Sequence, residues 1–269
     1  VGGYRYEDRG KLTSGGQPLT LYTDAINRAW ATVRFFDWDN DGDKDLFIHS
    51  PTGPYATQLI RYENTTISGG QLTFVLRGSV TTKYGTQTLE VGRTGNLQVT
   101  FVDWDGDGDT DIVAGQDSLI EVHENIGAIG NPLFQFKQYV QANGVDIQMW
   151  TASCDFADID SDGLRDLFVG TEEGRIYFFK NVGTQSAPAF REGRVLAHFE
   201  FMDARASVKV ADWDGDGLPD FVAGRYWERS QWGEDPRNYG RLYKNVGTPT
   251  NPVFEPRDAY NGSPYTERF

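Results

Sequence analysis

The sequence lacks the features that would place it in a membrane, in a disulfide-rich class or on nucleic acid. Its 269 residues contain a single cysteine, Cys154, so an internal disulfide is excluded. No apolar run reaches the roughly 18 residues that a membrane-spanning helix requires. The chain carries 39 acidic against 25 basic residues, a formal net charge of −14, whereas a nucleic-acid-binding surface is basic. We therefore expect no disulfide, no membrane span and no nucleic-acid partner.

Methionine is also scarce, with 2 residues against 31 glycines. This balance favours turns and strands over helices. Cys154 falls in a run predicted as a strand, residues 152–156, and we expect it to be a small buried apolar residue rather than a reactive thiol.

An acidic phrase with aspartates at alternate positions is present four times. It spans residues 37–45, 103–111, 158–166 and 212–220, and holds five, five, four and four aspartates. Carboxylates packed this closely repel one another unless a cation lies among them. A flexible loop that offers only oxygen ligands suits Ca²⁺ better than Mg²⁺. The sequence thus predicts about four calcium sites, one in each loop.

Each acidic phrase sits inside a larger repeat. The phrases begin 66, 55 and 54 residues apart. Short apolar runs precede and follow each one, a third run ends in Asn64, Asn125, Asn181 or Asn245, and a fourth carries Phe74, Phe134, Phe190 or Phe254. Four strands in each repeat predict an all-β fold, a β-propeller of four-stranded antiparallel blades.

This pattern resembles the FG-GAP/VCBS repeat of calcium-binding β-propellers, a family that includes the integrin α-subunit head and many secreted microbial proteins. The resemblance implies that each acidic loop joins the first and second strands of a blade. It implies side-chain ligands at loop positions one, three, five and nine, and a carbonyl ligand at position seven. The implied side-chain ligands are Asp37, Asp39, Asp41, Asp45, Asp103, Asp105, Asp107, Asp111, Asp158, Asp160, Asp162, Asp166, Asp212, Asp214, Asp216 and Asp220. The implied carbonyl ligands are Asp43, Asp109, Leu164 and Leu218.

The repeats place four complete blades at about residues 31–78, 97–139, 151–195 and 206–258. Residues 4–12 look like the last strand of a preceding blade, with residues 1–30 as strand and link, and residues 259–269 look like the start of a next link. The start at Val1 rather than Met suggests processing or a piece of a longer protein. Because family propellers commonly have seven blades, we expect a fragment or a ring that a partner chain completes.

Ligand binding is expected on the face opposite the acidic loops, where the repeat is interrupted. The largest interruption, residues 225–239, mixes aromatic rings with guanidinium groups, which suit sugar faces and carboxylates. The candidate ligand residues are Tyr55, Arg225, Tyr226, Trp227, Arg229, Trp232, Arg237 and Tyr239. The alternative is that these aromatic residues form a small local core.

His49 replaces a glycine found in the other repeats, at Gly115, Gly170 and Gly224. It is either a tolerated surface substitution or a ligand contact or base in a loop. With Tyr226 and Arg225 it would suit a polysaccharide lyase acting on a uronate-containing glycan. We prefer an extracellular or cell-surface module that binds glycans or proteins, or builds a surface assembly.

Charged residues at equivalent positions of the predicted first strands form one further departure from the repeat. Asp155 and Lys209 lie in adjacent repeats and could pair with one another. The alternative is a polar channel that binds an anionic ligand.

Overall fold

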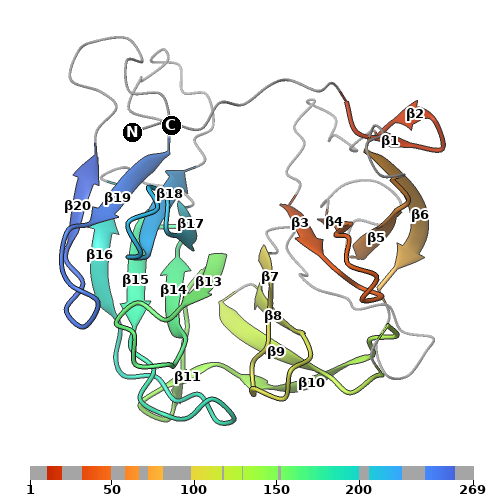
Figure 1. Ribbon diagram of the computed structural model, residues 1–269. Helices are drawn as coiled ribbons and strands as arrows, with labels where there is room; N and C mark the ends of the chain where they lie inside the picture. The colour runs from red at the N-terminus through yellow and green to blue at the C-terminus, as the bar shows by residue number, and fades with distance from the viewer. Residues whose placement is uncertain are drawn as a thin grey trace, which may run out of the picture. The chain divides into compact units, whose positions relative to one another are not determined.

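The computed structural model describes residues 11–19, 32–49, 58–66, 72–80, 98–116, 118–128, 130–150, 153–199, 206–225 and 240–257, and every regular element in these ranges is a β-strand (Figure 1). Four groups of four strands form the blades. Blade 1 has β3 (Thr32–Phe36), β4 (Asp45–His49), β5 (Leu59–Asn64) and β6 (Thr73–Ser79). Blade 2 has β7 (Gln98–Val102), β8 (Asp111–Gln116), β9 (Leu119–Asn125) and β10 (Phe134–Tyr139). Blade 3 has β13 (Ser153–Ala157), β14 (Asp166–Gly170), β15 (Arg175–Phe179) and β16 (Arg194–His198), and blade 4 has β17 (Ala206–Ala211), β18 (Asp220–Arg225), β19 (Arg241–Asn245) and β20 (Phe254–Arg257).

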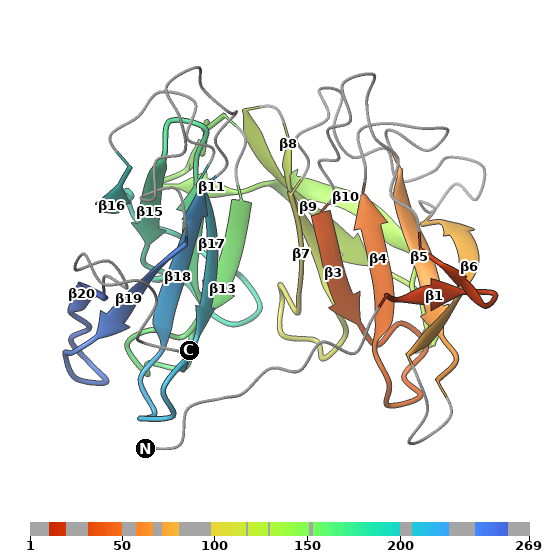
Figure 2. The same ribbon diagram turned by 90° about the horizontal axis from the view of Figure 1, so that it is seen from above.

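Within each blade the strands pair in chain order, antiparallel throughout. Figure 2 shows this order clearly for β3, β4, β5 and β6. The predicted fold class, an all-β propeller of four-stranded antiparallel blades, is confirmed. No described helix has the length and apolar character to cross a membrane.

The chain divides into two compact units, one with blades 1 and 2 and the other with blades 3 and 4. In each unit the second strands are the most buried. All five residues of β4 and of β14 are buried, which explains why these runs are continuously apolar rather than alternating.

Aromatic side chains hold each pair of blades together. Between blades 1 and 2, the Phe36 and Phe101 rings stack with centroids 4.9 Å apart, and Phe47 lies 4.8 Å from Phe101. Between blades 3 and 4, the buried Phe168 and Phe221 rings lie 5.9 Å apart. Facing large apolar residues of this kind supply most of the packing energy of a core.

Charged residues on the first strands also link neighbouring blades. The Lys209 ammonium donates to Asp155 Oδ1 at 2.8 Å, and the Val210 backbone N–H donates to Asp155 Oδ2 at 2.7 Å. Arg34 Nε donates to the carbonyl oxygen of Val99 at 2.6 Å. The predicted pairing of Asp155 with Lys209 is confirmed, and it satisfies a carboxylate that is 8% exposed.

Two short hairpins were not predicted. The strands β1 (Thr13–Ser14) and β2 (Gln17–Pro18) pair with each other, and β1 runs parallel to β6 at the edge of blade 1. The strands β11 (Gln141–Ala142) and β12 (Val145–Asp146) form a two-stranded sheet. The predicted strand at residues 4–12 lies almost entirely outside the described residues.

The fourth strand of blade 3 differs from the prediction. Phe190 faces Asn181 in an isolated bridge, and β16 begins only at Arg194. Phe190 therefore faces the asparagine of its own blade, as Phe74, Phe134 and Phe254 do in theirs. At Gly193 a Cβ would lie 2.5 Å from the Phe179 ring, so a side chain at this position would require the buried ring to shift.

Candidate metal centres

The four acidic loops share a backbone with two left-handed positions. Loop position four has a positive φ at Asn40 (59°), Gly106 (73°), Ser161 (59°) and Gly215 (76°). Loop position six is always glycine, with φ between 86° and 95°, where a side chain is strained. These two reversals curl the loop, so the alternating aspartates turn inward rather than to opposite sides.

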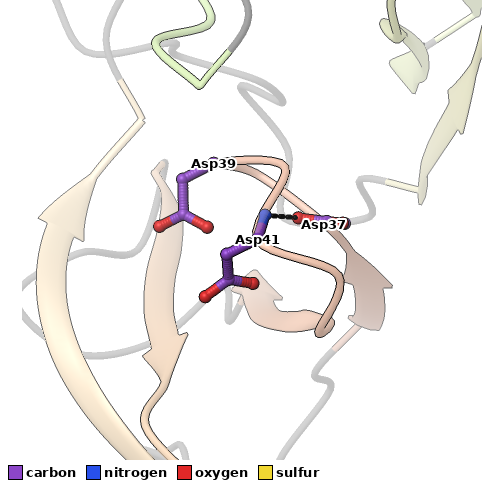
Figure 3. Close-up of side chains that lie close together, drawn as sticks. All are labelled: Asp37, Asp39 and Asp41. Atoms are coloured by element: carbon purple, nitrogen blue, oxygen red, sulfur yellow. Dashed lines mark hydrogen bonds between the residues drawn. The ribbon is translucent and has the colours of Figure 1, made fainter.

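The carboxylates of each loop converge. In every loop, three aspartates each offer an oxygen, and the three oxygens lie within 4.8 Å of one another. The converging sets are Asp37, Asp39 and Asp41; Asp103, Asp105 and Asp111; Asp158, Asp160 and Asp162; and Asp212, Asp214 and Asp220. Figure 3 shows the first set, with the Asp41 backbone N–H donating to Asp37 Oδ1 at 3.2 Å. Each loop could thus hold a metal ion.

The first aspartate of each loop accepts hydrogen bonds from the loop's own backbone. Gly42 N–H donates to Asp37 Oδ2 at 3.1 Å, and Gly163 N–H donates to Asp158 Oδ2 at 2.9 Å. Such bonds fix the carboxylate before any ion arrives.

The ninth aspartate has a structural role that the sequence reading did not assign. Its Oδ1 accepts the backbone N–H of the asparagine that ends the third strand, at 2.7 Å from Asn64, Asn125 and Asn245 and at 2.8 Å from Asn181. In three blades its Oδ2 also accepts the N–H of loop position two, from Trp104, Ile159 and Trp213. The four carboxylates are at most 2% exposed. The available signal was the recurrence of an asparagine at the end of each third apolar run, 14 to 25 residues after the ninth aspartate.

The same asparagines order the turn toward the fourth strand. Asn125 Oδ1 accepts the N–H of Gly127 and of Leu133, both at 3.0 Å. Asn245 Oδ1 accepts the N–H of Gly247 and of Val253, both at 3.1 Å. One aspartate and one asparagine thus connect the acidic loop, the third strand and the following turn.

Burial, with a smaller contribution from neighbouring aspartates, raises the pKa of several of these carboxylates. Burial raises the pKa of Asp111 and of Asp166 to about 6. Burial, followed by repulsion from the other four aspartates of its loop, raises the pKa of Asp109 to about 7. Nearby positive charge would favour the ionised forms.

The blade 2 loop fits a hard cation best. Among the described residues, Asp105 Oδ1 and Asp109 Oδ1 are buried oxygens with no hydrogen-bond partner. A buried carboxylate oxygen without a donor is costly. A cation that accepts oxygen ligands would satisfy both atoms.

A basic side chain also reaches each loop. In blade 1 Arg61 bonds Asp39 and Asp45, and in blade 2 Lys137 bonds Asp105. Lys180 and Lys244 reach the loops of blades 3 and 4. Sequence reading missed these contacts, because the basic residues lie far along the chain from the loops.

His49 is not a surface residue in a loop. It lies in β4 between Thr32 and Leu59, is 1% exposed, and its Nε2 has no hydrogen-bond partner among the described residues. Burial lowers its pKa to about 4. The prediction of a tolerated surface substitution is wrong, because the ring is buried. In blade 3 the equivalent residue must be glycine, since a Cβ on Gly170 would lie 2.4 Å from the Ala206 carbonyl oxygen.

Most of the predicted ligand residues lie outside the described part of the chain. These are Tyr55, Tyr226, Trp227, Arg229, Trp232, Arg237 and Tyr239, and the side chain of Arg225 is also not described. Arg225 ends β18, the strand that begins with loop residue Asp220. The interruption of the repeat therefore follows the end of β18 that is opposite the acidic loop. The lyase role of His49, Tyr226 and Arg225 stays a prediction.

Comparisons with known proteins give a family match and distant structural likenesses. The family model of the FG-GAP-like repeat matches residues 103–169 and 158–223, starting each time at the first aspartate of a loop. No curated protein sequence matches the chain. Among solved structures, the chain is similar to an Agrocybe aegerita lectin that recognises non-reducing terminal N-acetylglucosamine, at TM-score 0.45 and 17% identity, covering 90% of this chain and 53% of the lectin.

Two further structures show weaker likeness. One is TcdB2–TccC3, at TM-score 0.38 and 16% identity, covering 82% of this chain and 9% of that one. The other is the V. cholerae biofilm matrix protein Bap1, at TM-score 0.36 and 17% identity, covering 81% and 35%. The chain spans about half the length of the lectin and less of the other two.

Replacing Asp166 tests the structural role of the ninth aspartate apart from any metal. Asp166→Ala leaves the N–H groups of Asn181 and Ile159 without an acceptor in a buried position, so we expect it to lower the free energy of unfolding by roughly 3 kcal/mol. Asp162→Ala, in the same loop but exposed, should cost less than about 1 kcal/mol. Urea unfolding with excess chelator measures both, and equal losses would contradict the assignment.

His49 should make the protein sensitive to mild acid. Because its folded pKa of about 4 lies below its ordinary value of 6.5, only the unfolded chain takes up a proton as pH falls from 6.5 to 4. Its contribution is intact above pH 6.5, and about 2 kcal/mol should be lost at pH 5. Urea unfolding at pH 7 and pH 5 should show this loss in the wild type, in excess of any loss in His49→Gln. An identical pH dependence in both proteins would contradict the prediction.

Proposed function

We propose that this chain, a member of the FG-GAP repeat family, is an extracellular binding module whose acidic loops hold Ca²⁺ and whose ligand is a glycan. The observation that carries the proposal is the convergence of three carboxylates in each of four equivalent loops. Oxygen-only donors of this density are the ligand set that Ca²⁺ prefers.

Calcium in these loops would be structural. Each loop joins the first two strands of a blade, and its ninth aspartate already anchors the third. The side chains at loop positions one, three, five and nine would hold the ion, and the ion would neutralise a crowded set of carboxylates. With one cysteine in the chain, ion binding takes the stabilising place that disulfides have in many extracellular domains.

Support for glycan recognition comes from residues 225–239. This segment offers Trp227, Trp232 and three arginines. Tryptophan rings stack on sugar faces, and guanidinium groups bond hydroxyl and carboxylate oxygens. It follows the end of β18 away from the acidic loop, so ion binding and ligand binding would occupy different ends of blade 4.

Calcium should raise the melting temperature, and excess chelator should lower it, because an ion that binds only the folded chain stabilises it by mass action. At a free concentration 100 times the dissociation constant, each site contributes about 2.7 kcal/mol. Differential scanning fluorimetry and calorimetric titration measure this.

Asp107→Ala should weaken calcium binding in calorimetric titration. Glu173→Gln removes the same charge from a side chain that is 64% exposed and outside the loops, and should leave binding unchanged. Chelator-insensitive melting of the wild type would contradict structural calcium.

Glycan binding should depend on the tryptophans of the 225–239 segment. On an array of neutral and uronate-containing glycans, Trp227→Ala or Trp232→Ala should reduce affinity at least tenfold, since a buried aromatic contact is worth about 2 kcal/mol or more. Trp150→Ala is the control, because Trp150 is 61% exposed and lies in another segment. Binding that survives both substitutions would place the site elsewhere, and capture of protein ligands alone would replace the glycan assignment.

A further inference from the structure

One position sorts the four acidic loops into two kinds. The residue just before the asparagine that ends the third strand is Glu63 in blade 1 and Glu124 in blade 2, but Lys180 in blade 3 and Lys244 in blade 4. Strand register confirms the equivalence, because the preceding residues Tyr62, His123, Phe179 and Tyr243 all pair with the residue that follows the ninth aspartate.

In blades 3 and 4 the lysine ammonium enters the carboxylate cluster. Lys180 Nζ lies 2.6 Å from Asp160 Oδ1, 2.7 Å from Asp162 Oδ2 and 3.2 Å from Asp166 Oδ1. Lys244 Nζ bonds Asp214 and lies 2.9 Å from Asp216 Oδ2. In blade 3 the ammonium thus contacts three of the four carboxylates that would hold a calcium ion.

In blades 1 and 2 the glutamate instead draws a basic side chain toward itself. Glu63 pairs with Arg77. Glu124 pairs with Lys137 at 2.8 Å, and this same lysine reaches only one loop carboxylate, Asp105, at 2.7 Å. These two loops also contain a fifth aspartate, Asp43 or Asp109. Their carboxylates therefore exceed the positive charge near them by more than those of blades 3 and 4.

Arg61 contacts two loop carboxylates, as Lys244 does, but the blade 1 loop holds one carboxylate more than the blade 4 loop. Its guanidinium bonds Asp39 and Asp45 and lies over the Trp38 ring, 5.1 Å from the centroid. Among the described residues, no basic side chain reaches Asp37, Asp41 or Asp43, so three of the five carboxylates of this loop remain open to an ion.

We propose that Lys180 and Lys244 are built-in counter-ions that take the place of the divalent cation in blades 3 and 4, so that Ca²⁺ binds tightly only in blades 1 and 2. A divalent ion entering the blade 3 loop must repel or displace an ammonium held by three carboxylates. The inference rests on the proposed calcium binding, and it assigns the tight sites to the unit that contains blades 1 and 2.

The test counts tight calcium sites by equilibrium dialysis with metal analysis. The wild type should bind about two ions tightly, with any others at least roughly tenfold weaker. Lys180→Gln/Lys244→Gln should bind about four ions tightly. Arg175→Gln/Arg257→Gln, which removes the same charge from exposed arginines outside the loops, should still bind about two.

Thermal melting gives a second readout. Without calcium, the Lys180→Gln/Lys244→Gln protein should melt below the wild type, and calcium should raise its melting temperature by more than it raises that of the wild type. Glu124→Lys is the reverse change. It places an ammonium at the corresponding position of blade 2 and should reduce the tight sites from about two to about one, which keeps the test open if the double variant does not fold.

Four equally tight sites in the wild type, unchanged by the lysine substitutions, would overturn this inference and leave structural calcium intact. Two tight sites that persist in both Lys180→Gln/Lys244→Gln and Glu124→Lys would also overturn it. No binding in any of these proteins at millimolar calcium would overturn structural calcium itself, and this inference with it.

Discussion

The bond between a buried aspartate and the backbone N–H of an asparagine underlies each blade. The aspartate ends the acidic loop and begins the second strand, and the asparagine ends the third strand and orders the turn after it. A buried carboxylate that accepts two backbone N–H groups is a strong, short-range constraint. It closes the loop through the protein's own hydrogen-bonding groups, so the proposed cation would enter a loop that these bonds already shape.

The repeat explains how much of the fold could be predicted. Each acidic phrase has apolar runs on both sides and is followed by an asparagine and then a phenylalanine. This order defines the strands, and β3–β10 and β17–β20 follow it. The region of Phe190 shows where prediction from the repeat fails. Phe190 faces Asn181 in an isolated bridge, but β16 begins only at Arg194, after Gly193 has passed the Phe179 ring. A close approach between residues 14 positions apart leaves no periodic pattern in the sequence.

The loops themselves were predictable, but their surroundings were not. Alternating aspartates indicate a cation site from sequence alone, because charge repulsion is a local property. The ammonium of Lys180 and the guanidinium of Arg61 reach their loops only through strand pairing, at separations of about 20 residues. The same holds for His49. Its burial depends on its strand neighbours, so the sequence could mark it as unusual without saying that it is enclosed.

Repeats of one family are often treated as interchangeable parts, and position 49 shows why these are not. Blade 3 meets the next blade through a glycine that has no room for a β-carbon, whereas blade 1 encloses a whole imidazole at the same register. Exchanging the two segments by recombination would bring that ring against the Ala206 carbonyl. A duplicated blade must therefore acquire interface residues that fit its own neighbour. Once it has done so, the blades of this chain cannot change places without a steric clash.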